Sequence, residues 1–327
     1  MRTIYIVNLS AKNSYSRFIW RRIKSRLHGT EEAYYTNTPE EASKKISELA
    51  EQYKHDSLYI IGVGGDGTIS KVIEATLDYE NITIGYVPAG SGNDFARGFN
   101  WSNKPIRCLE KINEFQKSSP HLEYFDAGIY ELREYRNGSF VNNIGVGFDA
   151  AVAQKSNASK IKKLLNRFSL GKLIYAIFII KEALVYQTST VHLTIDNIEY
   201  EFENTWFITC SNQPYYGGGM IISPEAKPDD GKLNLTIVHN LSRHKLLLVF
   251  LSVFFGKHTH FKEVQTISGK DILINTKDRM LLHVDGDSIG TIHQQNSLHI
   301  TIKRESWKMF RALTSHDEIS KHLRKVN

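Results

Sequence analysis

The first 120 or so residues repeat one pattern, in which an apolar run is followed by a loop and then by a helical stretch. The runs with strand character are Arg2–Val7, Glu31–Thr36, Ser57–Val63 and Thr83–Val87. The helical stretches between them are Ser16–Leu27, Pro39–Tyr53 and Ile69–Leu77. Strand–loop–helix units at this spacing predict a parallel sheet in a doubly wound α/β domain.

Beyond residue 122 the pattern changes to short strands separated by turn residues, which predicts an antiparallel β-sandwich. The expected strands are Glu123–Leu132, Phe140–Val146, Val191–Ile195, Tyr200–Cys210, Lys232–Val238, Asp271–Thr276, Leu281–Val284 and Leu298–Lys303. Two helical insertions are expected, Ser159–Val185 and Ser242–Phe255. A last helix, Glu305–Lys325, is expected to return to the first domain. The predicted division is 1–122 for the α/β domain, with 304–327 packing back on it, and 123–303 for the sandwich.

Charge and cysteine content limit the expected partners and the expected cellular location. The net charge of +6 favours polyanionic partners without choosing among nucleotides, nucleic acid and anionic lipid. Two cysteines, Cys108 and Cys210, do not make a disulfide framework in a chain of 327 residues, so a cytoplasmic location is expected. The N-terminus lacks a signal-peptide pattern, and the longest apolar stretches, Leu173–Ile180 and Leu246–Phe255, are too short to span a bilayer. Any membrane contact is therefore expected to be peripheral.

The strongest local signal is the glycine-rich loop Gly62–Thr68, placed where a buried strand ends and a helix begins. Glycines let backbone N–H groups approach a phosphate, and the helix N-terminus adds positive potential. Asp66 inside the loop would repel a triphosphate unless a magnesium ion compensates it. A tight βα turn with a solvated aspartate is the alternative interpretation. The loop is neither a Walker A sequence nor a dinucleotide fingerprint.

A second loop, Pro88–Arg97, follows the next strand and should lie at the same edge of the sheet, where such folds bind ligands. Ser91 in this loop can donate to a phosphate or ribose oxygen. Asn93 and Asp94 could serve the site, or equally could cap the helix that begins near Phe95.

The sequences of the two loops, GGDGT and PAGSGNDFAR, together resemble the diacylglycerol kinase catalytic-domain family, which includes bacterial lipid kinases and sphingosine kinases. The resemblance continues in family order through most of the chain. Its further blocks are Phe125–Gly128, Asn143–Ala150, Tyr216–Gly219, Pro224–Gly231 and Asp285–Asp287. It implies ATP as phosphate donor, Mg²⁺ as cofactor, and a diacylglycerol-like lipid as acceptor, with phosphatidic acid or an analogous phospholipid as product.

By this resemblance the nucleotide lies on the first domain. The implied nucleotide-binding residues are Asn8, Leu9, Ser10, Ala11, Lys12, Thr36, Gly64, Gly65, Asp66, Gly67, Thr68, Ile69, Ser70 and Ser91. Leu9 stands where the family usually has proline, and Ser70 and Lys71 replace a usual asparagine–glutamate pair. These departures bear on the geometry around the adenine and the phosphates.

The resemblance also implies a regulatory or structural magnesium site in the second domain. Asp230 matches a magnesium-binding aspartate, helped by the main-chain carbonyls of Lys227 and Lys232, and oxygen ligands from one tight turn suit this ion. The ion would be linked through water to Asp66 and Asp126, which are both predicted to serve in catalysis together with Asp287. A turn leading into a strand is enough to account for an aspartate at position 229. For Asp126, a structural position at a strand edge is an equally good alternative to a place in the magnesium network.

Asp287 is the predicted general base. By itself Asp285–Asp287 is a hairpin turn, but in the family this block is usually Asp-Gly-Glu and its glutamate is the proposed base. Phosphoryl transfer needs an aligned acceptor oxygen and a late proton acceptor, which a carboxylate across the cleft can supply. The aspartate side chain is one methylene shorter, so the backbone has to make up the reach.

The segment Lys160–Lys172 alternates basic and apolar residues and is expected to lie on an anionic leaflet, whereas Leu173–Val185 is expected to pack on the sandwich. An ordinary surface helix is the alternative for both. The runner-up function is a soluble NAD kinase-like enzyme, which shares GGDGT. A non-catalytic nucleotide-binding relative ranks third, and no nucleic-acid partner is expected. A homodimer is plausible.

Overall fold

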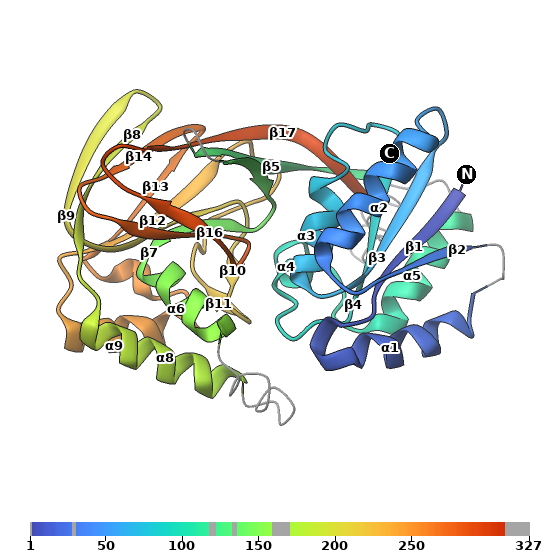
Figure 1. Ribbon diagram of the computed structural model, residues 1–327, viewed down its shortest axis with the longest axis horizontal. Coiled ribbons are helices and arrows are strands. Elements are labelled where there is room, and N and C mark those ends of the chain that lie inside the picture. Colours follow the sequence, from blue (N-terminus) through green and yellow to red (C-terminus); the bar gives the residue numbers. More distant parts are fainter. Residues whose placement is uncertain (1, 28–30, 118–121, 133–135, 159–170, 311–327) are drawn as a thin grey trace, which may run out of the picture.

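The computed structural model describes residues 2–27, 31–117, 122–132, 136–158 and 171–310. They form two domains side by side, an α/β domain and a β-rich domain (Figure 1). This confirms the predicted fold class, α/β followed by an antiparallel sandwich.

The α/β domain is built on a parallel sheet in the order β2-β1-β3-β4. Its strands are β1 (Arg2–Asn8), β2 (Glu32–Thr36), β3 (Leu58–Gly64) and β4 (Ile82–Pro88). Its helices are α1 (Ala11–Lys24), α2 (Pro39–Gln52), α3 (Asp66–Glu74), α4 (Asp94–Gly98) and α5 (Pro105–Lys117). Every residue of β3 and β4 is buried, as expected for central parallel strands with both faces covered. Thr38 caps α2 by accepting from the Glu41 N–H, and Pro39 fills the first helical position.

The second domain consists of antiparallel strands joined by short turns, with helices packed below them (Figure 1). Its strands are β5 (Leu122–Leu132), β6 (Arg136–Phe140), β7 (Asn143–Gly147), β8 (Ser189–Ile195), β9 (Ile198–Ser211), β10 (Tyr215–Tyr216), β11 (Met220–Ile221), β12 (Leu233–His239), β13 (Val264–Gly269), β14 (Asp271–Thr276), β15 (Met280–Val284), β16 (Asp287–Ile292) and β17 (Leu298–Phe310). Its α-helices are α6 (Phe148–Ala158), α8 (Gly171–Val185) and α9 (Arg243–Val253).

Two long strands, β5 and β17, connect the domains (Figure 1). The start of β17 pairs with β14 in the sandwich, and its end reaches β4 through the register Met309–Ile84. Trp307, Met309 and Phe310 are buried in the core of the α/β domain. The predicted helix Glu305–Lys325 is therefore wrong over Glu305–Phe310, where the chain returns to the first domain as a strand. Pairing with β5 and burial of these apolar side chains override the local helical pattern; residues 311–327 lie outside the described residues.

The predicted strand Phe140–Val146 is divided into β6 and β7. The break falls at Val141 and Asn142, whose N–H groups donate to the carboxylate of Asp285 instead of continuing a ladder. This interruption could not be read from the apolar pattern, because it depends on a residue 143 positions away.

Candidate active site

The two glycine-bearing loops meet at the carboxyl edge of the parallel sheet. β3 and β4 pair up to Gly64 and Pro88, and the Ala89 N–H donates to the Gly64 carbonyl at 2.7 Å. A Cβ atom added at Gly90 would lie 2.5 Å from the Gly65 Cα, so the two backbones approach more closely than any other residue would permit. The two glycine-bearing loops thus lie at the same edge of the sheet, as the sequence predicted.

The loop after β1 joins the same edge. Asn8 is buried and its amide donates to the Thr68 hydroxyl at 3.0 Å, while its side-chain oxygen accepts from the Ser10 N–H. The Leu9 N–H donates to the Thr36 carbonyl at 2.8 Å. Three parts of the predicted nucleotide site, namely the β1 loop, Thr36 and the glycine loop, are therefore in contact.

The other predicted nucleotide-binding residues differ in how far their side chains are exposed. Ser10 and Ser91 are exposed, Ala11 is half-buried at the start of α1, and Ile69 is buried on α3. The side chain of Lys12 lies outside the described residues. Nucleotide binding by this set stays a prediction.

Asp66 begins α3 but its carboxylate turns toward the second loop. Its Oδ1 accepts from the Phe95 N–H at 3.0 Å, so Asp66 caps α4 from across the loop. Asn93 occupies the N-cap position of α4, as the capping interpretation expected, but its side chain makes no capping hydrogen bond, and Asp94 is the first residue of the helix. Burial, and next the neighbouring carboxylate of Asp94, raise the pKa of Asp66 to about 7.

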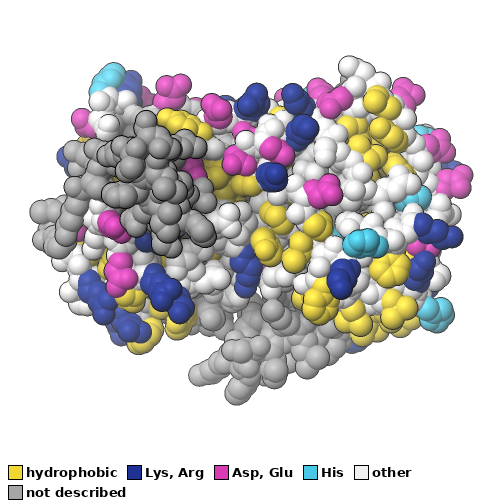
Figure 2. All heavy atoms as spheres, turned by 180° about the vertical axis from the view of Figure 1, so that it is seen from behind, with side chains coloured by type: hydrophobic (Ala, Val, Ile, Leu, Met, Phe, Trp, Pro, Cys, Tyr) yellow, Lys and Arg dark blue, Asp and Glu magenta, His cyan; other side chains and the backbone are white. Residues whose placement is uncertain are grey.

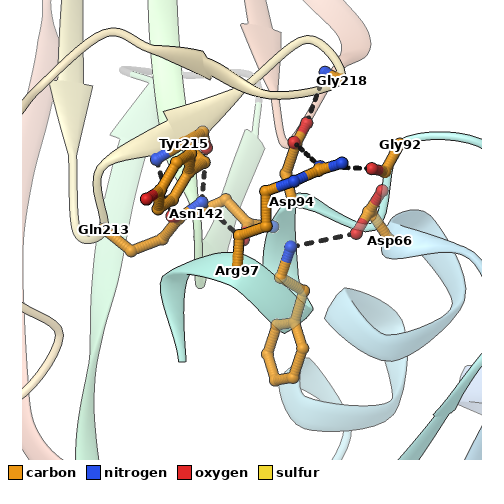
Figure 3. Close-up of polar contacts among 9 residues, drawn as sticks. Asp66, Gly92, Asp94, Arg97, Asn142, Gln213, Tyr215 and Gly218 are labelled. Carbon is orange, nitrogen blue, oxygen red and sulfur yellow. Dashed lines mark hydrogen bonds and ion pairs between the residues drawn. The ribbon is translucent and has the colours of Figure 1, made fainter. Parts of the chain in front are cut away.

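Asp94 links the α/β domain to the second domain (Figure 3). Its carboxylate pairs with Arg97 at 2.8 Å and accepts from the Gly218 N–H at 2.6 Å. Gly218 lies in a glycine run, Gly217–Gly219, in which all three residues have positive φ, and this conformation points the N–H at the aspartate. Burial raises the pKa of Asp94 as well. Asp66 and Asp94 are thus neighbouring carboxylates, of which Asp94 is compensated by Arg97.

A second bridge between the domains runs through Ser70. The Asn142 amide donates to the Ser70 hydroxyl at 3.2 Å, and the Asn142 side-chain oxygen accepts from Gln213 (Figure 3). Asn142 and Gln213 were not predicted. The only sequence signal for Asn142 was its place beside the Asn143–Ala150 block, and this did not show that its partner would be a residue of the glycine-loop helix.

A polar cleft of about 280 Å³ lies between the domains, and Asp287 lines it together with Gly67 and Ser70. Its other lining residues are Glu40, Lys71, Glu74, Tyr130, Arg136, Ser139, Val284, Asp285, Ser288 and Ile289. The predicted base thus shares one cleft with the predicted phosphate loop.

The turn Asp285–Asp287 positions that carboxylate. Asp285 and Gly286 both have positive φ, as in a tight two-residue hairpin turn. The carboxylate of Asp285 is held by the N–H groups of Val141, Asn142 and Asn143. Asp287 keeps an exposed side chain, yet partial burial in the cleft raises its pKa, opposed by Lys71 and supported by Asp285 and Glu40. A raised pKa suits a proton acceptor.

Asp126, on β5, lies beside the turn that contains Asp230 and leads into β12. The Asp126 carboxylate accepts from the N–H groups of Gly231 and Glu305, both at 2.8 Å, and these bonds account for its burial. Asp230 is exposed and accepts from the Lys232 N–H at 3.1 Å; the side chains of Lys227 and Lys232 are exposed. Partial burial raises the pKa of Asp230, and Asp126 and Asp229 add to the effect. A catalytic role for Asp126 and a magnesium site at Asp230 stay predictions.

The carboxylate in the glycine loop would suit a magnesium ion that takes few protein ligands. Among the described residues no three His, Cys, Asp or Glu side chains cluster as a complete metal cage. Magnesium commonly takes one or two carboxylates and completes its shell with water and substrate phosphate. The carboxylate of Asp66 fits that pattern, whereas the carboxylate of Asp94 is already paired with Arg97 at 2.8 Å.

An apolar cavity of about 50 Å³ lies in the second domain, between α6, α8, α9 and the sheet. It is lined by Phe148, Asp149, Val152, Ile179, Phe207, Tyr216, Met220, Ile222, Leu246, Val249, Phe250 and Val253. Its one ionisable carboxylate, Asp149, is buried and bonds to His283 and Thr209, both at 3.1 Å. His283 lies on β15, the strand that ends at the turn before Asp287.

Comparisons with known proteins agree with this geometry. The family described as "Diacylglycerol kinase catalytic domain" matches residues 2–121, and "YegS C-terminal NAD kinase beta sandwich-like domain" matches residues 142–299. The chain is 30% identical over 292 residues to the Bacillus subtilis protein named "Putative lipid kinase YtlR", which covers 88% of this chain and 93% of that protein. The chain belongs to the diacylglycerol kinase catalytic-domain family.

Solved structures of this lipid kinase family and of a neighbouring one share the fold. A crystal structure from Bacillus anthracis, described as a putative diacylglycerol kinase, superposes with a TM-score of 0.71 at 21% identity, covering 95% of this chain and 97% of that one. Yeast NADH kinase complexed with NADH superposes with a TM-score of 0.54 at 12% identity, covering 100% of this chain and 88% of that one. The lipid kinase family and the NADH kinase thus share a two-domain plan.

Family membership supports kinase activity for this chain. Among the described residues, no helix is long and apolar enough to cross a bilayer. The basic segment Lys160–Lys172 falls almost wholly outside the described residues, and its membrane role stays a prediction.

Proposed function

We propose that this chain transfers the γ-phosphate of ATP, with Mg²⁺, to the hydroxyl of diacylglycerol or a similar membrane lipid, forming phosphatidic acid or its analogue. The observation that carries the proposal is the cleft in which Asp287 faces Gly67 and Ser70 of the glycine loop. The donor triphosphate would lie on the loops around Gly65 and Gly90, and the acceptor would enter from the second domain.

The proposed reaction forms one bond, breaks one bond and transfers one proton. The lipid hydroxyl oxygen forms a bond to the γ-phosphorus, the bond between that phosphorus and the oxygen of ADP breaks, and the hydroxyl proton passes to the carboxylate of Asp287. Bound magnesium would neutralise phosphate charge next to Asp66 and Asp94. The protein's own part is to align donor and acceptor and to hold the proton.

A lipid acceptor is favoured over NAD by the apolar cavity in the second domain. NAD has no long apolar part to fill such a site, whereas an acyl chain does. The cavity is narrow, so a bound chain would widen it by moving side chains of α8 or α9.

Labelled ATP should therefore transfer phosphate to a lipid and not to NAD. The assay compares diacylglycerol, phosphatidylglycerol and a sphingoid base in mixed micelles with NAD and with no acceptor, and identifies the product by chromatography. Phosphorylation of NAD alone, or ATP hydrolysis without any acceptor product, would contradict the proposal. A dimer, if formed in solution, would be seen in the same preparations by analytical ultracentrifugation.

Filling the apolar cavity should weaken lipid use selectively. Val249→Phe adds a ring to the cavity wall and is expected to raise KM for a long-chain lipid about 10-fold, equivalent to about 1.4 kcal/mol, with KM for ATP unchanged. The matched control is Ile198→Phe, which adds the same ring at an exposed position outside the cavity lining. Equal lipid KM values in Val249→Phe and wild type would show that the cavity is not part of the acceptor site.

A further inference from the structure

Helices α8 and α9 carry an unusual amount of exposed apolar surface. The large hydrophobic side chains exposed there and just after α9 are Ile180, Leu184, Val185, Leu248, Leu251 and Phe255. Leu184 is 69% exposed and Phe255 is 74% exposed. We call these six side chains the apolar face. A concentration of this kind on one part of a surface marks an interaction site more often than chance exposure.

The apolar face is held rigid by contacts between the two helices. Arg243 at the start of α9 donates to the carbonyls of Ala183 and Tyr186 at the end of α8. The opposite sides of the helices pack in one core cluster through Ile179, Ala183, Leu246 and Val249. The six side chains are therefore presented by a fixed pair of helices.

The same two helices line the apolar cavity with their inner sides. Ile179 of α8 and Leu246, Val249, Phe250 and Val253 of α9 all face it. The cavity proposed for an acyl chain and the exposed apolar face are thus separated by the thickness of one helix layer. A surface in contact with lipid chains at this place would lie next to the acceptor site.

The charges around the apolar face are positive. α9 contains no acidic residue, and the one in α8, Glu182, is buried and pairs with Lys155. The exposed basic residues are Lys181, Arg243 and Lys257, with His244 beside them. Lys245 pairs with Glu263, itself largely buried. Figure 2 shows hydrophobic side chains gathered along the lower edge of this domain, among lysine, arginine and histidine side chains.

We propose that the apolar face of α8 and α9 docks on a bilayer that contains anionic lipid, with its side chains in the interface and the basic residues against the headgroups. Its use in delivering the acceptor rests on the proposed function, but binding itself can be measured without catalysis. The face differs from the basic segment Lys160–Lys172, for which membrane contact was expected from the sequence.

The test is co-sedimentation with vesicles of phosphatidylcholine alone and of phosphatidylcholine with phosphatidylglycerol. The double variant Leu248→Glu/Leu251→Glu places two carboxylates in the face without touching the cavity lining. We expect its affinity for the anionic vesicles to fall at least about 10-fold, and wild type to bind the neutral vesicles more weakly than the anionic ones. Circular dichroism and melting temperature verify that the variant is folded.

The matched control is Ile198→Glu, at the turn between β8 and β9. Ile198 is 58% exposed. The turn between β8 and β9 lies at the opposite end of the domain from α8 and α9 (Figure 1). This change should leave vesicle binding unaltered. Equal loss in the control and in the double variant would show a general charge effect and overturn the proposal.

Two further outcomes separate docking from its alternatives. If the double variant binds vesicles as wild type does, the proposal is wrong, and a change from dimer to monomer in that variant would assign the face to a second copy of this chain. Phosphorylation of a water-soluble, short-chain diacylglycerol should be retained in the double variant. If wild type phosphorylates no lipid while the difference in vesicle binding remains, the proposed function fails and the docking surface stands.

Discussion

Replacing Asp287 by asparagine is expected to lower kcat for lipid phosphorylation by about 10²–10⁴-fold and to leave ATP affinity nearly unchanged. The amide keeps the size of the side chain in the cleft but cannot accept the hydroxyl proton. Because Asp287 is exposed on a turn fixed by Asp285, the fold should not suffer. Steady-state kinetics and a separate nucleotide-binding titration measure the two effects.

Asp287→Glu is the matched control, since a glutamate is usual at this position in the family. It should retain activity within about one order of magnitude of wild type, because it restores the proton acceptor and changes only its reach. Full activity in Asp287→Asn would reject Asp287 as the base.

The pH profile gives an independent check on the same residue. The base must be ionised, so kcat should rise with pH through the raised pKa of Asp287 and then level off. Glu40 is one of the carboxylates that raise this pKa, so Glu40→Gln should move the acid limb to lower pH. An unmoved limb in Glu40→Gln would assign the limb to another group.

Asp66→Asn should have the second large effect, and it should act on activity and stability in opposite directions. We expect kcat/KM to fall about 100-fold and ATP binding to lose its magnesium dependence, because the carboxylate facing the phosphate loop loses its charge. In the absence of nucleotide, the same variant should be more stable than wild type above pH 7, by at most about 4 kcal/mol, since one pKa unit corresponds to about 1.4 kcal/mol.

The sign follows from the raised pKa. The carboxyl ionises near 3.8 in the unfolded chain and near 7 in the folded one, so below about pH 4 it is protonated in both and costs nothing. As the pH rises toward 7, the unfolded state releases its proton first, and the stability of the wild type declines through that window. Asparagine does not titrate and still accepts from the Phe95 N–H. Thermal melts at pH 4 and pH 8 measure the difference; Asp56→Asn, an exposed carboxylate in the same domain, should show none.

The behaviour of Asp66 illustrates what its sequence context could and could not reveal. The glycines around it predicted a phosphate loop, and Asp66 itself predicted a need for a cation. That Asp66 also caps α4 and lies near Asp94 depends on how the second loop folds over the first. The sequence correctly offered Asn93 as the N-cap residue, but it did not show that the carboxylate of Asp66, rather than the side chain of Asn93, accepts from the Phe95 N–H.

The sequence by itself determined the alternation of strands and helices, the order of the two domains and the positions of both glycine loops. These follow from local periodicity and from backbone freedom, which neighbouring residues decide. Tertiary structure alone decided that residues 305–310 form a strand, since burial of Trp307 and Phe310 against the first domain outweighs their helical pattern. It also decided the bridge from Ser70 to Asn142, the cleft that Asp287 shares with Gly67, and the exposed face of α8 and α9. Each of these depends on contacts between residues far apart in the chain, whose free energy no local pattern contains.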